Sequence, residues 1–275
     1  MDLIIISHKE VFYSKKSIGQ YRTSGGFPHQ IEHISKLFSK TTLICTLRYT
    51  KSNKGLVPLI GKNLRVFALP EPPFKGHLRH LSLFFWLPKY IKLFHDKIRH
   101  SDAVHILVPG DIGLIGLLIS FFYNKPIFIR HCGTWGNKTT LVDQFLYWLL
   151  PKIARDKNIV MATGGGIKPP EQNNKNIKWI FSTSIKEFEW GKIKKSKSWV
   201  SGKPLKLITV ARITKDKNIH SIIKSIPKIK QSYKNLKLDI IGDGPELKSL
   251  KSLIVSLDLK EQVKILGRLN HKQII

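Results

Sequence analysis

The sequence predicts an α/β protein with two doubly wound parallel sheets, the second of them incomplete, and three observations support this class. Strand-like and helix-like segments alternate along the 275 residues, as in a parallel sheet covered by helices. A stretch rich in Lys, Ser and Gly interrupts the alternation once. After it, three strands follow before the chain ends within a helical pattern. We therefore expect a first domain over residues 1–190, a basic linker over 191–204 and part of a second domain over 205–275.

The elements of the first domain follow from apolar periodicity. Residues 3–7 form a short apolar strand, and a long polar loop follows it. Ser24-Gly25-Gly26-Phe27-Pro28 then opens a helix to about Phe38, because apolar residues recur at helical spacing. Further strands are expected at 41–46, 64–68, 103–108, 126–130, 159–162 and 178–181, and further helices at 81–98, 112–123 and 141–150.

The same alternation restarts in the second domain. Strands are expected at 206–210, 236–241 and 262–266, with helices at 218–232 and 245–257. A last helix begins near Asn270, and no Gly or Asn cap follows it before Ile275.

The net charge of +29 predicts an anionic partner. A membrane surface, a polyanionic substrate and nucleic acid all fit this charge. Lys outnumbers Arg by 38 to 9, whereas Arg has the fork that matches phosphates and guanine edges. An anionic membrane surface is therefore favoured, and nucleic acid is not expected as a partner. A composition set by an AT-rich genome, without a function, stays open as the alternative.

Cysteine use and hydropathy favour a cytoplasmic location. The two cysteines, Cys45 and Cys132, form no CxxC pair and indicate a reducing compartment. The N-terminus lacks the pattern of a signal peptide. The longest apolar stretch, 112–123, is shorter than the roughly 20 residues that cross a bilayer. The positive charge leaves a peripheral position on the inner face of the plasma membrane open.

Two cations mark the first loop of the second domain. Arg212 and Lys217 follow the strand 206–210 and precede a helix that Asn218 is expected to cap. Ligands of open α/β sheets bind at the carboxyl ends of the strands. Two cations beside a helix N-terminus would suit a diphosphate. A solvated loop in a Lys-rich protein is the alternative.

A second turn of the same domain carries two glycines. Gly242-Asp243-Gly244-Pro245 follows the strand 236–241 and opens a helix with proline in its first turn. Gly242 and Gly244 would let a nucleotide approach the backbone. By itself the turn is a weak signal, because any tight turn uses these residues.

Together these segments resemble the C-terminal domain of family 4 (group 1) glycosyltransferases. The resemblance spans 205–267 and rests on Ala211-Arg212, Lys217-Asn218, the run from Gly242 to Leu247, and Leu266-Gly267-Arg268. It implies the GT-B fold of two Rossmann-like domains and a retaining transfer of sugar from a nucleoside diphosphate. In that family the corresponding Arg and Lys hold the donor diphosphate, so the resemblance implies this role for Arg212 and Lys217. Ala211 stands where the family more often has glycine.

The first domain resembles the same family at two places. Gly25-Gly26, before a helix, resembles the glycine-rich loop that approaches the donor phosphates and the acceptor; an ordinary helix start is the alternative. The strand 126–130 delivers Arg130 and His131 to its carboxyl end. The resemblance implies that His131 lies near the donor sugar as a catalytic residue; a structural histidine is the alternative.

The sequence gives no sign of a metal ion or of a cofactor other than the nucleotide-sugar co-substrate. It contains no Asp-x-Asp motif and no His/Asp/Glu cluster, so Arg212, Lys217 and helix dipoles would neutralise the leaving diphosphate. The paired glutamates of the family would lie beyond Gly267, and the chain ends before them. The resemblance therefore implies a truncated second domain with an incomplete nucleotide-sugar site.

One helix of the first domain combines aromatic and basic residues. As an interfacial helix it would dock on anionic lipid; a core-packing helix with a solvated edge is the alternative. Within 77–100, the apolar members are Leu81, Leu83, Phe84, Phe85, Trp86, Leu87 and Tyr90, and the basic members are Arg79, Lys89, Lys92, Lys97 and Arg99.

These features together predict a retaining glycosyltransferase. It would move a sugar from a nucleoside-diphosphate sugar to a glycan or lipid-linked acceptor, in bacterial surface polysaccharide synthesis by analogy. Two alternatives stay open: an inactive remnant and a non-catalytic binding protein. A nucleic-acid-binding protein is disfavoured, because no recognition helix or aromatic stacking motif is evident.

Overall fold

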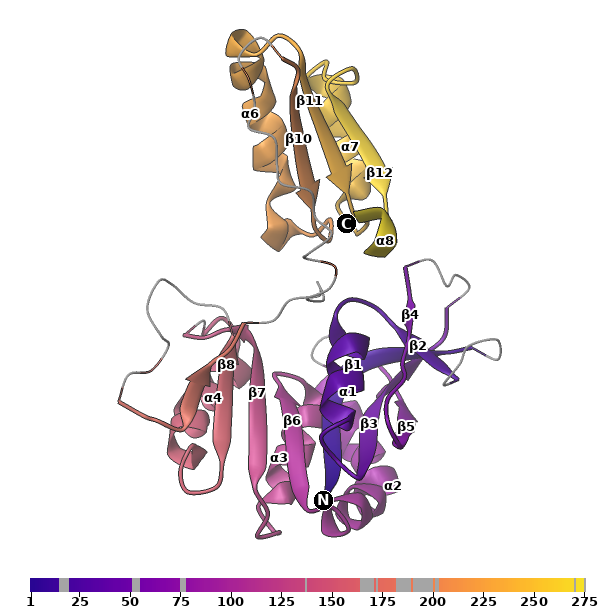
Figure 1. Cartoon of the computed structure of the whole chain (residues 1–275), viewed down its shortest axis with the longest axis vertical. Helices are drawn as coiled ribbons and strands as arrows, with labels where there is room; N and C mark the ends of the chain where they lie inside the picture. The colour runs from indigo at the N-terminus through magenta and orange to yellow at the C-terminus, as the bar shows by residue number, and fades with distance from the viewer. Residues whose placement is uncertain are drawn as a thin grey trace. The chain divides into compact units, whose positions relative to one another are not determined.

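The computed structural model divides the chain into two compact units (Figure 1). Unit 1 holds Met1–Lys51 and Leu56–Ile185, and unit 2 holds Ser52–Gly55 and Lys186–Ile275. The structure describes residues 1–14, 20–50, 55–74, 78–136, 138–163, 171, 173–181, 189, 200, 203–269 and 271–274. Most of the expected linker 191–204 and the expected helix start at Asn270 therefore lie outside the described residues.

Unit 1 is built on a nine-stranded sheet. Seven strands run parallel in the order β5-β3-β1-β6-β7-β8-β9. The last residues of β1 pair antiparallel with β2, and β2 pairs antiparallel with β4. The strands are β1 Asp2–Tyr13, β2 Tyr21–Thr23, β3 Lys40–Arg48, β4 Val57–Pro58, β5 Leu64–Pro70, β6 Ala103–Val108, β7 Ile127–Thr134, β8 Ile159–Thr163 and β9 Ile177–Trp179.

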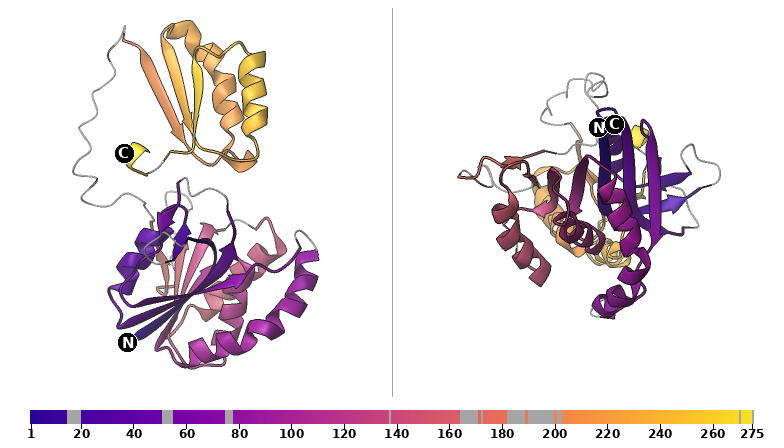
Figure 2. Two further views of the ribbon diagram at one scale, coloured as in Figure 1. Left: turned by 90° about the vertical axis from the view of Figure 1, so that its right-hand side faces the viewer. Right: turned by 90° about the horizontal axis from the view of Figure 1, so that it is seen from below.

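Helices cover both faces of this sheet, as Figure 2 shows. The helix α1 (Phe27–Ser35) lies on one face, and α2 (Leu78–Arg99), α3 (Asp111–Ser120) and α4 (Leu141–Ile153) lie on the other. The connections β5–α2–β6, β6–α3–β7 and β7–α4–β8 each join parallel strands in the same direction across the sheet. Because such crossovers are right-handed, all three helices lie on one face. Alternate residues of β1 accordingly enter different cores: Leu3 and Ile5 pack with α1, and Ile4 and Ile6 pack with α2, α3 and α4.

Unit 2 contains a three-stranded parallel sheet in the order β10-β11-β12. Its buried core joins the sheet to α6 and α7 through residues such as Ile223, Ile240 and Leu250. The elements are β10 Leu205–Val210, the 3-10 turn η1 Lys215–Lys217, α6 Ile219–Ser232, β11 Leu236–Ile241, α7 Leu247–Ser256, β12 Val263–Gly267 and α8 His271–Ile274.

The structure confirms the predicted fold class, an α/β protein with two Rossmann-like units and parallel sheets. The strand expected at 103–108 and that at 236–241 have the predicted bounds. The polar loop expected directly after Ser7 is wrong, because β1 continues to Tyr13 and pairs with β2 and β3 there. The edge strands β2 and β4 were not predicted, since two or three residues carry too little periodicity.

No helix within the described ranges is both long and apolar enough to cross a membrane.

Candidate functional site

The loop between β10 and α6 carries both predicted diphosphate ligands of unit 2. Arg212 is exposed two residues after β10 ends, and Lys217 is exposed at the end of η1. The Lys217 ammonium lies 3.2 Å from Asp216 Oδ2, and both side chains are largely in solvent. Exposed pairs of this kind contribute little to stability. Both cations can therefore turn to an incoming anion at small cost.

Asn218 occupies the N-cap position of α6, as predicted, but its side chain does not cap the helix. Its backbone is left-handed, with φ of 47°, and its side chain makes no capping hydrogen bond to the helix. Instead Asn218 Oδ1 accepts from the Ser221 hydroxyl at 2.9 Å. The predicted cap position is therefore confirmed, and the cap lacks a hydrogen bond between the side chain and the helix backbone. The first backbone N–H groups of this 14-residue helix donate no hydrogen bond to the Asn218 side chain, and the positive end of the helix dipole lies at the loop that carries Lys217.

The glycines of the second turn fit tightly against this loop. A Cβ on Gly242 would lie 1.8 Å from the Ala211 carbonyl oxygen, and one on Gly244 would lie 2.2 Å from the Ile213 carbonyl oxygen. The Ile213 N–H donates to the Asp243 carbonyl at 2.9 Å, which joins the two loops. Close backbone approach therefore requires glycine at both positions, whether or not a nucleotide binds there. Their predicted role towards the nucleotide stays a prediction.

The glycine pair of unit 1 lies at the start of α1. Gly25 has φ of +76°, and nothing lies within 4 Å of a Cβ placed on it. Gly26 occupies the N-cap position without a side-chain cap, and its carbonyl accepts from the Gln30 N–H at 3.2 Å. On the preceding residue, the Ser24 hydroxyl accepts from Lys9 Nζ at 3.3 Å. The loop is therefore open on its outer side and has a cation beside it.

His131 is buried within β7, just before a register shift in the pairing with β8, and the strand expected to end at residue 130 continues to Thr134. Its Nδ1 lies 3.1 Å from the Gly133 carbonyl oxygen, and its ring meets Trp135 edge to face with centroids 5.5 Å apart. Because a carbonyl only accepts, Nδ1 carries the proton and Nε2 is left as the acceptor in the neutral ring. Burial lowers the pKa of His131 below its ordinary value of 6.5. The imidazole is therefore neutral at pH 7.

Arg130 precedes His131 in the strand and points to the opposite face of the sheet. Its Nη1 donates to Gln30 Oε1 at 2.5 Å, which ties β7 to α1. Among the described residues, no hydrogen bond or ion pair joins His131 to Gly25 or Gly26. Within unit 1 the structure thus links Arg130 to the helix behind the glycine loop, and not His131.

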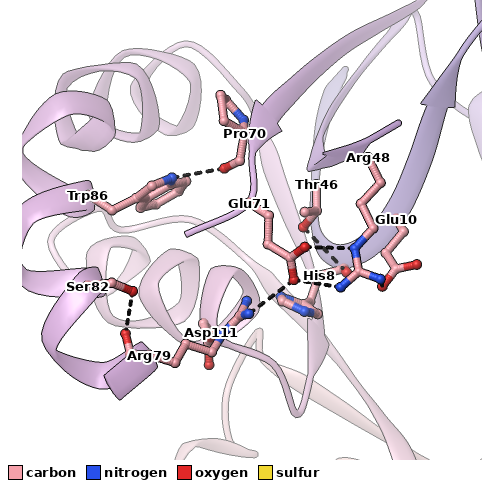
Figure 3. Close-up of polar contacts among 10 residues, drawn as sticks. All are labelled: His8, Glu10, Thr46, Arg48, Pro70, Glu71, Arg79, Ser82, Trp86 and Asp111. Atoms are coloured by element: carbon pink, nitrogen blue, oxygen red, sulfur yellow. Dashed lines mark hydrogen bonds and ion pairs between the residues drawn. The ribbon is translucent and has the colours of Figure 1, made fainter. Parts of the chain in front are cut away.

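A charged network at the same end of unit 1 was missed by the sequence analysis (Figure 3). The Arg48 guanidinium donates to both oxygens of Glu71, at 2.7 and 2.8 Å, and lies 2.9 Å from Glu10 Oε1. Arg79 pairs with Glu71 at 3.1 Å and donates to Asp111 through Nε. The bonds from Arg48, then those from Arg79, lower the pKa of Glu71 to about 2.

His8 lies among these groups, at the bulge of β1. Its pKa is lowered, first by burial and then by Arg79, while Asp111 acts in the opposite direction. Its Nδ1 is buried, and no described residue supplies it with a hydrogen-bond partner. One signal could have revealed the network: Glu71 follows β5 directly and Asp111 opens α3 shortly after β6, which places both at carboxyl ends of strands.

Metal ligands do not gather in the described part of the chain. Within those residues no three His, Cys, Asp or Glu side chains lie close enough together to hold an ion. That no metal takes part in the reaction stays a prediction.

The fold is of the GT-B type, and similar solved structures have several activities. Sucrose-phosphate synthase from Thermosynechococcus elongatus superposes with a TM-score of 0.59 and 12% identity, over 99% of this chain and 71% of that one. The apo form of the lipopolysaccharide outer core galactosyltransferase WaaB gives 0.53 and 13%, over 98% and 68%. The UDP-GlcNAc 2-epimerase of Methanocaldococcus jannaschii gives 0.52 and 14%, over 100% and 75%. At these identities the likeness shows the fold alone.

Sequence comparison is more specific for the second unit. Residues 192–275 match the family model described as Glycosyl transferases group 1. This segment contains the Arg212–Lys217 loop and the glycine turn. The chain is 29% identical to alpha-monoglucosyldiacylglycerol synthase of Acholeplasma laidlawii over 237 residues. This alignment covers 76% of the present chain and 56% of the synthase. The chain thus spans little more than half the length of this curated relative.

Proposed function

We propose that the protein is a retaining glycosyltransferase of family 4 that uses a nucleoside-diphosphate sugar. One observation carries the proposal: two exposed cations lie at the carboxyl end of a parallel strand, beside a helix N-terminus without a side-chain cap, within the segment that matches group 1 glycosyl transferases. A diphosphate needs this combination of charge and unused N–H donors. For an ordinary solvated loop in a Lys-rich protein, we would expect neither a place within the family match nor a glycine turn packed against its backbone.

In the proposed reaction the bond between the anomeric carbon and the diphosphate oxygen breaks. The acceptor oxygen forms its bond on the same face of the sugar, and its proton passes to the leaving diphosphate. Negative charge grows on that diphosphate, and Arg212 and Lys217 stabilise it together with the α6 dipole. With two cations in place, the charge can be balanced without a metal ion.

His131 is proposed to orient the donor sugar. The neutral ring has one nitrogen bonded to the Gly133 carbonyl, so the other can accept a hydrogen bond from a sugar hydroxyl. The open loop at Gly25-Gly26 is proposed to line the phosphate and acceptor side, since nothing within 4 Å blocks an approach to Gly25.

The proposed acceptor is a glycan or a lipid-linked molecule of bacterial surface polysaccharide or glycolipid synthesis. The name of the curated relative, alpha-monoglucosyldiacylglycerol synthase, supports this class of acceptor. A peripheral position on the cytoplasmic face of an anionic membrane would bring the protein to such an acceptor. The net charge of +29 supports it, as do Leu81, Phe84 and Phe85, which α2 exposes although Trp86 and Phe94 of the same helix pack in the core.

The test is a transfer assay on the 275-residue chain. The chain is incubated with radiolabelled sugars carried on different nucleoside diphosphates, and with vesicles that contain diacylglycerol or bacterial lipid extract. We expect label in the lipid fraction, and a loss of roughly 100-fold or more in rate for the double variant R212A/K217A. The control K224A/K228A removes two exposed lysines from α6 and keeps the rate.

An unchanged rate in R212A/K217A would refute the proposed site. Nucleotide binding without transfer under every condition would favour the alternative, a non-catalytic or inactive protein.

A further inference from the structure

The helix α4 is apolar on two opposite sides. Leu146 and Leu150 are fully buried against the sheet. Leu141, Phe145 and Trp148 recur at helical spacing on the opposite side and are 82%, 40% and 56% exposed. A helix of a soluble domain normally places polar residues there. The burial in unit 1 therefore accounts for one side of α4 and leaves an aromatic stripe on the other.

Lysines lie at both ends of α4, and each contacts an aromatic ring of the helix. Lys152 Nζ is 3.7 Å from the centroid of the Trp148 ring, and Lys138 Nζ is 4.0 Å from that of Tyr147. The nearby carboxylate of Asp143 is engaged in the capping box, where it accepts from the Thr140 backbone at 3.1 Å. No carboxylate of the described residues pairs with either lysine. Aromatic rings flanked by lysines are the composition of protein surfaces at the membrane interface.

The same side of the sheet carries more exposed apolar residues. The helices α2, α3 and α4 all lie there, as Figure 2 shows, and the His95 ring of α2 contacts the Phe122 ring just after α3 with centroids 6.3 Å apart. We call the outward sides of these three helices, together with Phe121 and Phe122 just after α3, the helical face. Its exposed apolar members are Leu81, Phe84, Phe85, Leu118, Phe121, Phe122, Leu141, Phe145, Tyr147 and Trp148.

We propose that the helical face docks on a lipid bilayer that contains anionic lipids, with α4 as a principal contact. Phe145 and Trp148 enter the headgroup region, and Lys138 and Lys152 pair with lipid phosphates. This deepens the proposed function, since it names the surface by which the protein meets its membrane. Its test is separate from that of the donor site, because the proposed diphosphate ligands Arg212 and Lys217 lie in unit 2.

Charge decides between a bilayer and a second copy of the chain. Two copies that met through this face would bring lysines against lysines in a protein with a net charge of +29. An anionic bilayer offers the opposite charge together with an apolar layer for the rings. The bilayer satisfies both features of α4, and a second copy satisfies only the apolar one.

The experiment is co-sedimentation of the chain with vesicles of phosphatidylcholine, with and without phosphatidylglycerol. We expect binding to the anionic vesicles, and a partition coefficient at least roughly tenfold lower for F145S/W148S. The variant F145L/W148F keeps the apolar stripe and should bind like the wild type. L37S is the matched control, because Leu37 is 79% exposed just after α1, the helix on the opposite face of the sheet.

A second pair of variants tests the charge. K138E/K152E should lower binding to anionic vesicles roughly tenfold, whereas K224E/K228E changes net charge equally in unit 2 and should lower it far less. Circular dichroism confirms that each variant is folded, and nucleotide binding in solution should be unchanged in all of them. If the wild type binds no nucleotide, that result counts against the proposed function and not against the membrane-docking role of the helical face.

Three results would overturn the proposal. F145S/W148S could bind anionic vesicles like the wild type, or the wild type could bind neutral and anionic vesicles equally. Alternatively, the wild type could leave vesicles unbound and form dimers that F145S/W148S abolishes, which would assign the face to a second copy of the chain.

Discussion

The backbone of Gly242 approaches Ala211 so closely that a Cβ on the glycine would lie 1.8 Å from the alanine carbonyl oxygen. The two residues are far apart in sequence but directly follow two neighbouring parallel strands, β11 and β10. The contact fixes the backbone just before Arg212. In this arrangement the close packing of Gly242 determines where the proposed ligand-binding side chain of Arg212 begins.

Gly242→Ala should therefore destabilise unit 2 and displace the Arg212 loop. A backbone collision of this size in a packed turn costs roughly 1–3 kcal/mol or more, and the positive φ of 155° adds strain. The measurement is the free energy of unfolding by urea, together with nucleoside diphosphate affinity. Gly267→Ala is the control: Gly267 has φ of +72° in the same unit, but nothing lies within 4 Å of its Cβ position. Equal effects of the two substitutions would show that φ alone, and not the Ala211 contact, matters.

Acid should weaken the Arg48–Glu71–Arg79 network. The bonds from Arg48 and Arg79 hold the pKa of Glu71 at about 2, against an ordinary value of 4.5. The unfolded chain thus takes up this proton first as the pH falls, so the stabilisation is present above pH 4.5 and is lost towards pH 2. We expect E71Q to be less stable at pH 7 by roughly 1–3 kcal/mol and to lose less stability in acid. Parallel stability curves for wild type and E71Q from pH 6 to about pH 2.5 would contradict this.

The buried His105 should lower the free energy of unfolding at a higher pH than Glu71 does. Burial lowers its pKa to about 4 from 6.5, and its Nδ1–H donates to the Phe128 carbonyl at 3.0 Å. The folded state keeps the ring neutral while the unfolded state becomes protonated, so stability is lost between pH 6.5 and 4, by at most about 3 kcal/mol. H105Q retains a donor and should flatten the curve in that range. Urea titrations at several pH values measure the effect, and an unchanged slope in H105Q would refute it.

His131→Ala should lower the rate of transfer much more than nucleotide binding. The substitution removes the acceptor nitrogen proposed to orient the sugar, at a cost of roughly 100-fold in rate. Since burial lowers the pKa of His131, the wild-type rate should fall only when the pH drops below 6.5. The neighbouring Cys132 is exposed, and C132A should transfer normally. A full rate in H131A would leave His131 with its packing role against Trp135 and Gly133.

Continuous apolar runs made the central strands predictable. Every residue of β6 is buried, because helices cover both faces of the sheet, and the run 103–108 therefore stands out in the sequence. The last part of β1 had no such signal. His8, Lys9 and Glu10 resemble a loop, but Glu10 pairs with Arg48 of the neighbouring strand. A strand stabilised by a partner 38 residues away cannot be identified from its own composition.

The candidate site was predictable to a similar extent. Arg212, Lys217 and the two glycines of unit 2 were predicted from motif order; all four lie in the matched segment 192–275, and their roles stay predictions. The tight fit of Gly242 on Ala211 could not be found, because it depends on the pairing of β10 with β11. The Arg48–Glu71–Arg79 network was missed for the same reason, since its members come from separate strands and helices.

The most direct test of the proposed donor site is calorimetric titration of the chain with nucleoside diphosphates that differ in base. We expect one of them to bind the wild type and the control K224A/K228A with equal affinity. R212A/K217A should bind it at least roughly 100-fold more weakly, because two charge-assisted contacts to the diphosphate are lost. Undiminished affinity in R212A/K217A, or an equal loss in K224A/K228A, would show that the loop between β10 and α6 does not hold the diphosphate.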